Sequence, residues 1–314
     1  MRAPVPARDR GGMATKPLRS TPANRAVRSA RRPVARFVAL PDGRRLHALT
    51  WKGRGTALVL LHGVLDSASG WNDLCRATSR PCIAIDLGGF GESDLPAQPS
   101  FAAYADDVIV ALDDLGCEDY VLVGHSLGGA VATLIAEHRP GQVRALVLLA
   151  PAGFGRVPLA EMISLPGVRI VARRVLPLTL TSRAAVAATY RTVISNGRDA
   201  SDEVLERILD KRGALVPGAV EATKAVVRGG LSAHALHRRR VAYDGDVTVV
   251  WGDHDRVVPA AHAAGVARAL PQAQFHTWSG MGHHPQVERP AELAELIENA
   301  CRRAETARAL SAAA

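Results

Sequence analysis

Residues 120–128 have the sequence YVLVGHSLG, and this stretch decides the fold. The apolar run before Gly124 predicts a buried strand, and Leu127–His138 predicts a helix that follows it without a loop. A turn this tight needs small residues on both sides of its central residue, which explains Gly124 and Gly128. It lifts the hydroxyl of Ser126 above the sheet beside a helix N-terminus, so Ser126 is the predicted nucleophile.

Strands and helices alternate on both sides of this turn. Further strands are predicted at 36–40 and 45–53 (a hairpin), 56–63, 81–89, 143–153, 246–255 and 273–280. Further helices are predicted at 70–78, at 101–115 between Ser100 as N-cap and Gly116, at 259–270 and at 290–310. This order predicts an α/β fold, with an eight-stranded, mostly parallel sheet and helices on both faces.

The alternation stops between residues 153 and 242, where helical patterns occur without a buried strand. An all-helical insertion after the sixth strand predicts a cap over the carboxyl edge of the sheet, where open α/β sheets bind ligands. The core is then expected at 34–152 and 243–314. Residues 1–33 are rich in Arg, Pro, Ala, Ser and Thr and lack aromatic residues, which predicts a disordered basic tail.

The formal net charge of +9 belongs to this tail. Residues 1–36 hold ten Lys or Arg and one acidic residue, so basic and acidic residues balance over the rest of the chain. We therefore expect no nucleic-acid partner. The predicted cap over the carboxyl edge of the sheet leads us to expect a small-molecule substrate. Residues 153–240 hold fifteen basic and seven acidic residues, which we interpret as solvated helix faces. Alternatively, one arginine faces the pocket and favours an anionic substrate, the candidates being Arg169, Arg173, Arg174 and Arg183.

Cysteine and hydropathy patterns exclude several other classes of site. The four cysteines, at 75, 82, 117 and 301, have neither paired spacing nor histidines at metal-ligand spacing, so no metal is expected. Scattered thiols favour a reducing compartment, here the cytoplasm. No apolar run approaches the roughly 18–20 residues that cross a bilayer, so no membrane partner is expected. The sequence does not indicate an oligomeric state.

Two polar clusters follow buried strands further along the chain. Asp253 and Asp255 come after the strand that ends at Gly252, and His283 and His284 lie in the loop after the last strand. A serine hydroxyl is a poor nucleophile unless an oriented imidazole removes its proton. Serine, aspartate and histidine in this chain order, each after a different strand, are expected of a hydrolytic triad on an α/β sheet.

The strand that ends at His62-Gly63 supplies a candidate oxyanion site. A tetrahedral intermediate needs two preorganised N–H donors. The backbone N–H of Leu127, directly after the serine, is the first candidate, and the N–H of Val64 is the second. Because one histidine suffices as the base, we expect His62 to support this loop.

From about residue 36 to residue 310 the chain resembles the α/β-hydrolase family, in its serine-nucleophile branch with a helical cap. The matching motifs are His62-Gly63, DLGGFGES at 86–93, GHSLG at 124–128, Gly252…Asp255…Pro259 and Gly282-His283…Glu288-x-Pro290. The resemblance implies Asp255 as the acid in place of Asp253, and His283 as the base in place of His284. It also implies that loop 86–93 flanks the site and cradles no phosphate, so no cofactor is expected.

Within this family, serine at position 126 argues against haloalkane dehalogenases and epoxide hydrolases, which use aspartate there. It permits esterases, thioesterases, aminopeptidase-like members, carbon–carbon bond hydrolases and cofactor-free perhydrolases. Carbon–carbon hydrolases often have Asn before the serine and Trp after the histidine, where this chain has His125 and His284. The resemblance thus favours hydrolysis of a small to medium carboxylic ester or thioester through an acyl-enzyme. A carbon–carbon hydrolase, a perhydrolase and a ligand-binding receptor with little turnover remain alternatives.

Overall fold

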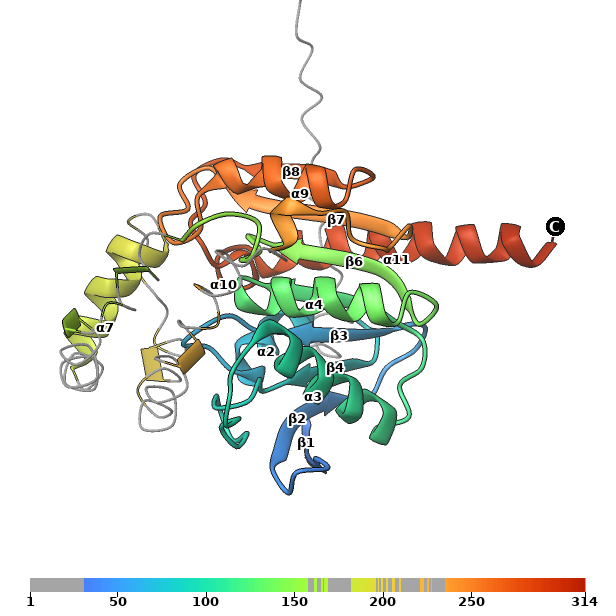
Figure 1. Ribbon diagram of the computed structural model, residues 1–314, viewed down its shortest axis with the longest axis horizontal. Coiled ribbons are helices and arrows are strands. Elements are labelled where there is room, and N and C mark those ends of the chain that lie inside the picture. Colours follow the sequence, from blue (N-terminus) through green and yellow to red (C-terminus); the bar gives the residue numbers. More distant parts are fainter. Residues whose placement is uncertain are drawn as a thin grey trace, which may run out of the picture.

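The computed structural model describes residues 31–157, 182–195 and 235–313, with scattered positions between 161 and 227. Its eight strands form one sheet in the order β1-β2-β4-β3-β5-β6-β7-β8 (Figure 1). The strands are β1 Val34–Ala39, β2 Arg45–Trp51, β3 Ala57–Leu61, β4 Cys82–Ile85, β5 Tyr120–His125, β6 Val143–Leu149, β7 Asp246–Gly252 and β8 Gln274–Trp278. β2 is antiparallel to β1 and β4, and all later neighbours are parallel, which confirms the predicted fold class.

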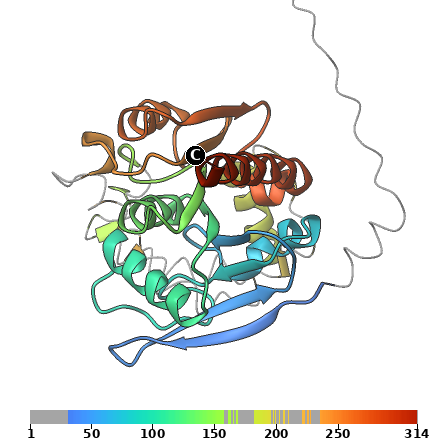
Figure 2. The same cartoon turned by 90° about the vertical axis from the view of Figure 1, so that its right-hand side faces the viewer.

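Helices cover both faces of the sheet (Figures 1 and 2). The helices of the described residues are η1 Ala68–Trp71, α2 Asn72–Ala77, α3 Phe101–Asp114, α4 Leu127–His138, α7 Arg183–Thr189, η2 Tyr190–Ile194, η3 Leu236–Arg238, η4 Ala260–His262, α9 Ala263–Ala269, α10 Pro285–Glu288 and α11 Pro290–Ala313. The helices α3, α4 and α9 pack on one face, and α2 and α11 pack on the other. Among the described helices, none has the length and apolar character needed to cross a membrane.

Strand β3 shows why both faces of the sheet need a layer of helices. Its residues from Leu58 to Leu61 are all fully buried. Side chains alternate along a strand, so Leu58 and Leu60 pack with α2 and α11, whereas Val59 and Leu61 pack with α3 and α4. A continuous apolar strand of this kind is stable only between two helical layers.

Helix α3 confirms the predicted capping residues. The hydroxyl of Ser100 accepts a hydrogen bond from the N–H of Ala103 at 3.0 Å, which satisfies one of the unpaired donors of the first turn. Gly116, just beyond the last turn, has φ +64°, a conformation that glycine adopts without strain. The ends of this helix therefore follow from local sequence.

The predicted cap lies between β6 and β7. The residues described there form α7, η2 and η3, and they include no strand. The helical patterns predicted between residues 153 and 242 lie largely outside the described residues, as do Arg169, Arg173 and Arg174. The domain boundary at 153–242 therefore stays a prediction.

Arg31 lies within the predicted tail and is the first residue that the structure describes. It is attached to the core. Its Nη1 donates to the carbonyl oxygens of Cys75, at 2.9 Å, and Thr78. Its Nη2 donates to the carbonyl oxygens of Lys52, at 2.7 Å, and Arg80, at 2.6 Å. These hydrogen bonds differ from the expectation of a disordered tail up to residue 33, and the boundary of the tail stays a prediction. The sequence does not predict this contact, because all four carbonyl groups belong to segments far from Arg31 along the chain.

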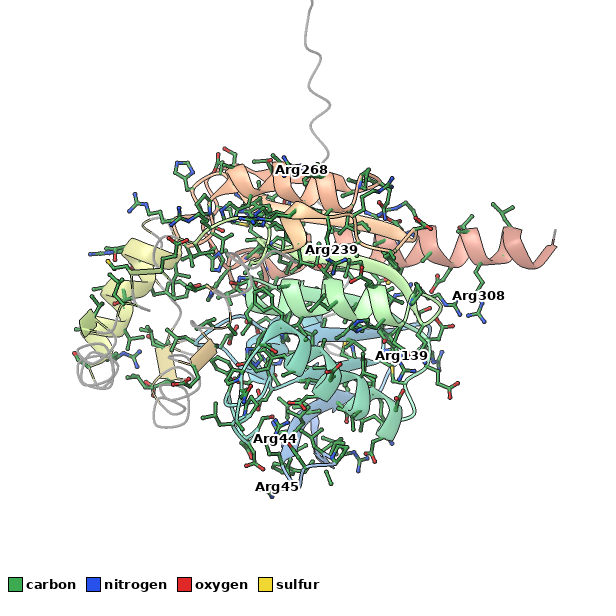
Figure 3. All side chains as sticks on the ribbon, in the orientation of Figure 1. Arg44, Arg45, Arg139, Arg239, Arg268 and Arg308 are labelled. Atoms are coloured by element: carbon green, nitrogen blue, oxygen red, sulfur yellow. The ribbon has the colours of Figure 1, made fainter. Side chains whose placement is uncertain are left out.

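Four of the arginines labelled in Figure 3, Arg44, Arg139, Arg239 and Arg308, pair with acidic residues. Arg44 makes two hydrogen bonds to Asp107, at 2.7 and 2.8 Å. Arg139 pairs with Asp113 at 2.9 Å. Such pairs add little to stability, but they leave these cations already neutralised on the surface.

Replacing Arg31 tests its role as an anchor. We expect Arg31→Ala to lower the free energy of unfolding by about 1–3 kcal/mol, because hydrogen bonds from a charged donor are lost together. The matched control is Arg32→Ala, an exposed neighbour, which we expect to change it by less than about 0.5 kcal/mol. Urea unfolding followed by circular dichroism measures both. Equal effects would show that Arg31 does not anchor the segment.

Candidate active site

Ser126 stands at a strained turn between β5 and α4. Its backbone has φ +51° and ψ −115°, a region that residues with side chains rarely adopt. Such a conformation costs on the order of 1–3 kcal/mol and persists only where the surroundings impose it. Here the N–H of Ser126 donates to the carbonyl of Leu149, and its carbonyl accepts from the N–H of Ala152, both at 2.9 Å.

Three glycines let the chain close around this turn. A Cβ at Gly124 would lie 2.4 Å from the carbonyl oxygen of Gly128, and one at Gly128 would lie 2.3 Å from that of Leu61. A Cβ at Gly63 would lie 3.0 Å from the Cβ of Ser126. The loop after β3 therefore approaches the serine more closely than any side chain at Gly63 would permit. This confirms the expected reason for small residues at the turn.

The predicted acid and base are in direct contact. His283 Nδ1 lies 2.7 Å from Asp255 Oδ2. The other carboxylate oxygen, Oδ1, accepts hydrogen bonds from the N–H groups of Val257, at 2.8 Å, and Val258, at 2.9 Å. The side chain of Asp255 is fully buried, and that of His283 is 4% exposed. Asp255 is therefore fixed on both sides of its carboxylate.

The surroundings of Asp255 keep it ionised. Burial raises the pKa of this carboxyl, but the charge interaction and hydrogen bond with His283 and the two backbone N–H groups outweigh burial, so its pKa is lowered. An ionised carboxylate at Nδ1 orients the imidazole with Nε2 available as a base and stabilises the imidazolium that proton transfer creates.

Asp253, the competing aspartate, faces elsewhere. Its Oδ1 accepts a hydrogen bond from the N–H of Gly280 at 2.8 Å and lies 2.6 Å from His254 Nδ1. The side chain is about one-third exposed. Asp253 therefore ties the loop after β7 to the turn after β8, while Asp255 reaches His283.

The candidate oxyanion donors, the N–H groups of Leu127 and Val64, belong to the start of α4 and to the loop after β3. Leu127 is the first residue of α4, where backbone N–H groups have no acceptor within the helix. Val64 follows Gly63 in the loop that approaches Ser126. His62 is fully buried; its Nδ1 bonds the carbonyl of Gly63 at 2.7 Å, and its Nε2 accepts from the N–H of Leu87 at 3.0 Å. Both ring nitrogens are engaged, which agrees with the expected supporting role of His62.

The main chain of His283 is held at both its N–H and its carbonyl. Its N–H donates to the carbonyl oxygen of Ile194 in η2, at 2.7 Å. Its carbonyl oxygen lies 2.8 Å from His125 Nε2. A Cβ at Gly282 would lie 2.0 Å from the same Ile194 oxygen, so only glycine permits this approach. Sequence analysis missed these contacts because the partners are far apart in the chain.

Loop 86–93 is organised by a second buried aspartate–histidine pair. Asp86 Oδ2 lies 2.7 Å from His47 Nδ1, and both side chains are almost completely buried. The carboxylate also accepts hydrogen bonds from the N–H groups of Ala68, at 2.6 Å, and Glu92, at 3.0 Å. A Cβ at Gly91 would lie 1.9 Å from Asp86 Oδ2. The glycine makes room for a carboxylate, which fits a structural loop and not a phosphate cradle.

Three histidines gather beside the serine, and their chemistry does not suit a metal. Ligand atoms of His125, His283 and His284 lie within 4.8 Å of one another. However, His125 Nε2 faces a carbonyl and so carries a hydrogen, and its Nδ1 lies 3.1 Å from the amide nitrogen of Gln286. His283 Nδ1 is bound to Asp255. Nε2 of His125 carries a hydrogen and the lone pair of its Nδ1 is engaged by Gln286, so the donor set does not fit a metal ion.

A family comparison agrees with this fold. Residues 58–296 match the model of the alpha/beta hydrolase family. The match covers most of the chain, so the chain belongs to this family and is an enzyme of the hydrolase class.

Relatives of the chain include proteins with different hydrolytic activities. An uncharacterized protein of Mycobacterium tuberculosis is 32% identical over 286 residues, which cover 87% of this chain and 83% of that protein. A 2-hydroxymuconate semialdehyde hydrolase of Pseudomonas putida is 28% identical, over 79% of this chain and 88% of the relative. The structure of a thermophilic esterase from Thermogutta terrifontis is similar with a TM-score of 0.68 and 25% identity, covering 87% of this chain and 99% of the esterase.

Substitution of the two aspartates distinguishes their roles. Asp255→Asn keeps the shape but removes the charge beside His283, so we expect turnover of a nitrophenyl ester to fall on the order of 10³–10⁴-fold. Asp253→Asn should cost about tenfold or less, because it alters only a loop contact. Circular dichroism checks that both variants are folded. If Asp253→Asn is the crippled variant and Asp255→Asn is nearly normal, the acid is misassigned.

Proposed function

We propose that this protein is a serine hydrolase that cleaves a small to medium carboxylic ester or thioester through an acyl-enzyme. The observation that carries the proposal is the buried, ionised Asp255 bound to His283, whose carbonyl is held by His125 directly before Ser126. A carboxylate–imidazole pair beside a serine on a strained turn is the arrangement that activates a hydroxyl for attack on a carbonyl.

In the first half-reaction, His283 Nε2 accepts the hydroxyl proton as Ser126 Oγ bonds to the substrate carbonyl carbon. The N–H groups of Leu127 and Val64 bind the resulting oxyanion. The tetrahedral intermediate then collapses, and His283 gives its proton to the departing alcohol or thiol. In the second half-reaction water attacks the acyl-serine with His283 again as base, which releases the acid and restores the serine.

Two features of the fold support this chemistry. The hydroxyl lies at the N-terminus of α4, where the helix dipole and unpaired N–H groups favour negative charge. The residues involved are also largely buried, with Ser126 7% exposed and His283 3% exposed. Electrostatic stabilisation is stronger in such a water-poor site than in bulk water.

A carbon–carbon bond hydrolase is the second candidate, since the Pseudomonas putida relative is named for such a substrate. The presence of His125 and His284 favours the ester hydrolase. A cofactor-free perhydrolase and a receptor with little turnover are further alternatives. An anionic substrate gains no support from Arg183, because its guanidinium pairs with Asp202, at 2.5 Å, and Glu206 on an exposed surface.

We also propose a cytoplasmic location. The four cysteines are buried and form no disulfide with one another, which suits a reducing compartment.

A panel of substrates tests the proposed function. Nitrophenyl esters from acetyl to octanoyl, the corresponding coenzyme A thioesters, and a 2-hydroxy-6-oxo-dienoate as a carbon–carbon substrate are offered to the protein and to Ser126→Ala. We expect turnover of at least one ester or thioester series and none by Ser126→Ala. Faster cleavage of the dienoate than of every ester would favour the carbon–carbon hydrolase. Ligand binding without turnover on any substrate would favour the receptor.

A further inference from the structure

His125, which precedes the nucleophile, is fully enclosed among the loops that build the site. Its Nε2 lies 2.8 Å from the carbonyl oxygen of His283, and its Nδ1 lies 3.1 Å from the amide nitrogen of Gln286 in α10. A Cβ at Gly63 would lie 2.9 Å from the same Nδ1. His125 therefore touches the base loop, the loop after β3 and α10 at once.

These partners determine where the ring carries its hydrogen. A carbonyl oxygen only accepts, so Nε2 must be the protonated nitrogen that donates to His283. In a neutral ring Nδ1 is then an acceptor, which matches the amide donor of Gln286. Burial, together with the nearby His283 and His284, lowers the pKa of His125 well below its ordinary value and keeps the ring neutral. Both ring nitrogens are satisfied in one tautomer only.

We propose that His125, with Gln286 fixing its tautomer, is a positioning residue that holds the main chain of the base at His283. This inference rests on the proposed function, because it assigns His283 as the base. The residue beside the nucleophile thereby sets the distance between nucleophile and base. A displacement of about 1 Å between reacting groups can cost on the order of 10²-fold in rate.

Paired substitutions at position 125 separate the hydrogen bond from the packing. In His125→Gln the side-chain amide places an N–H donor close to where Nε2 was, whereas His125→Leu keeps much of the volume and offers no donor. We expect His125→Leu to lower kcat about 10–100-fold with little change in KM, because the ring is buried and both of its nitrogens are engaged within the protein. His125→Gln should recover most of the parent kcat. His276→Leu, at an exposed histidine on β8, is the control and should match the parent.

A spectroscopic readout on the full-length parent tests the same inference without turnover. Long-range ¹H–¹⁵N spectra of the histidine rings, with His125 assigned from His125→Gln, should show a hydrogen on Nε2, none on Nδ1, and no titration between pH 5 and 8. The ring signals of His283 should shift in His125→Leu and stay near their parent positions in His125→Gln.

The outcomes distinguish this inference from the proposed function. A parent without turnover on any substrate, but with the neutral Nε2–H ring and the shift of His283 in His125→Leu, contradicts the proposed function and supports the positioning contact. A turning-over parent in which His125→Leu and His125→Gln have equal kcat overturns the inference. A hydrogen on Nδ1 of His125, or a charged ring at neutral pH, also overturns the inference. Because this spectrum is measured on the parent, it decides the matter even if His125→Leu does not fold.

Discussion

The positive φ of Ser126 is the constraint on which the site depends. A side chain held in this conformation cannot relax into β5 or α4, so it projects from the turn at the carboxyl edge of the sheet. Gly124 and Gly128 make the turn sterically feasible, and Gly63 lets the loop after β3 close over it. The strain is offset by the packing of β5 and α4, which are among the most completely buried elements of the core.

Around this turn, long-range hydrogen bonds bring together segments that no local rule connects. His283, the proposed base, is fixed at three points, by Asp255 at its ring, by Ile194 at its N–H and by His125 at its carbonyl. The contact with Ile194 matters because η2 belongs to the region predicted as the cap. A second contact, from Arg256 to the carbonyl of Thr192 at 3.0 Å, joins η2 to the loop that bears Asp255, the proposed acid. η2 is thus hydrogen-bonded to both of the loops that carry the proposed acid and base.

Much of this arrangement follows from sequence, for identifiable reasons. Uninterrupted apolar runs predict strands buried on both faces, and Ser100 and Gly116 mark the ends of α3 through capping chemistry. The turn at Ser126 is encoded by its two flanking glycines. The choice of Asp255 over Asp253 does not follow from such local rules, because both residues follow the same strand. Only the resemblance to a family distinguished them.

The rest could not be predicted because it depends on backbone groups, which every residue carries. The carbonyls bound by Arg31, and those bound by His125 and the N–H of His283, have no signature in side-chain type. The arginine-rich character of residues 1–33 even concealed Arg31, since composition alone favours disorder for the whole segment. Packing brings such groups within hydrogen-bonding distance, and only a three-dimensional structure reveals it.

The central claim is that Ser126 is the nucleophile, and covalent labelling tests it most directly. The full-length protein is treated with a fluorophosphonate, digested, and mapped by mass spectrometry, with Ser126→Ala as the control. The account predicts one phosphonylated serine, at position 126, and no adduct in the variant. An adduct on another residue, or labelling that persists in Ser126→Ala, would contradict it.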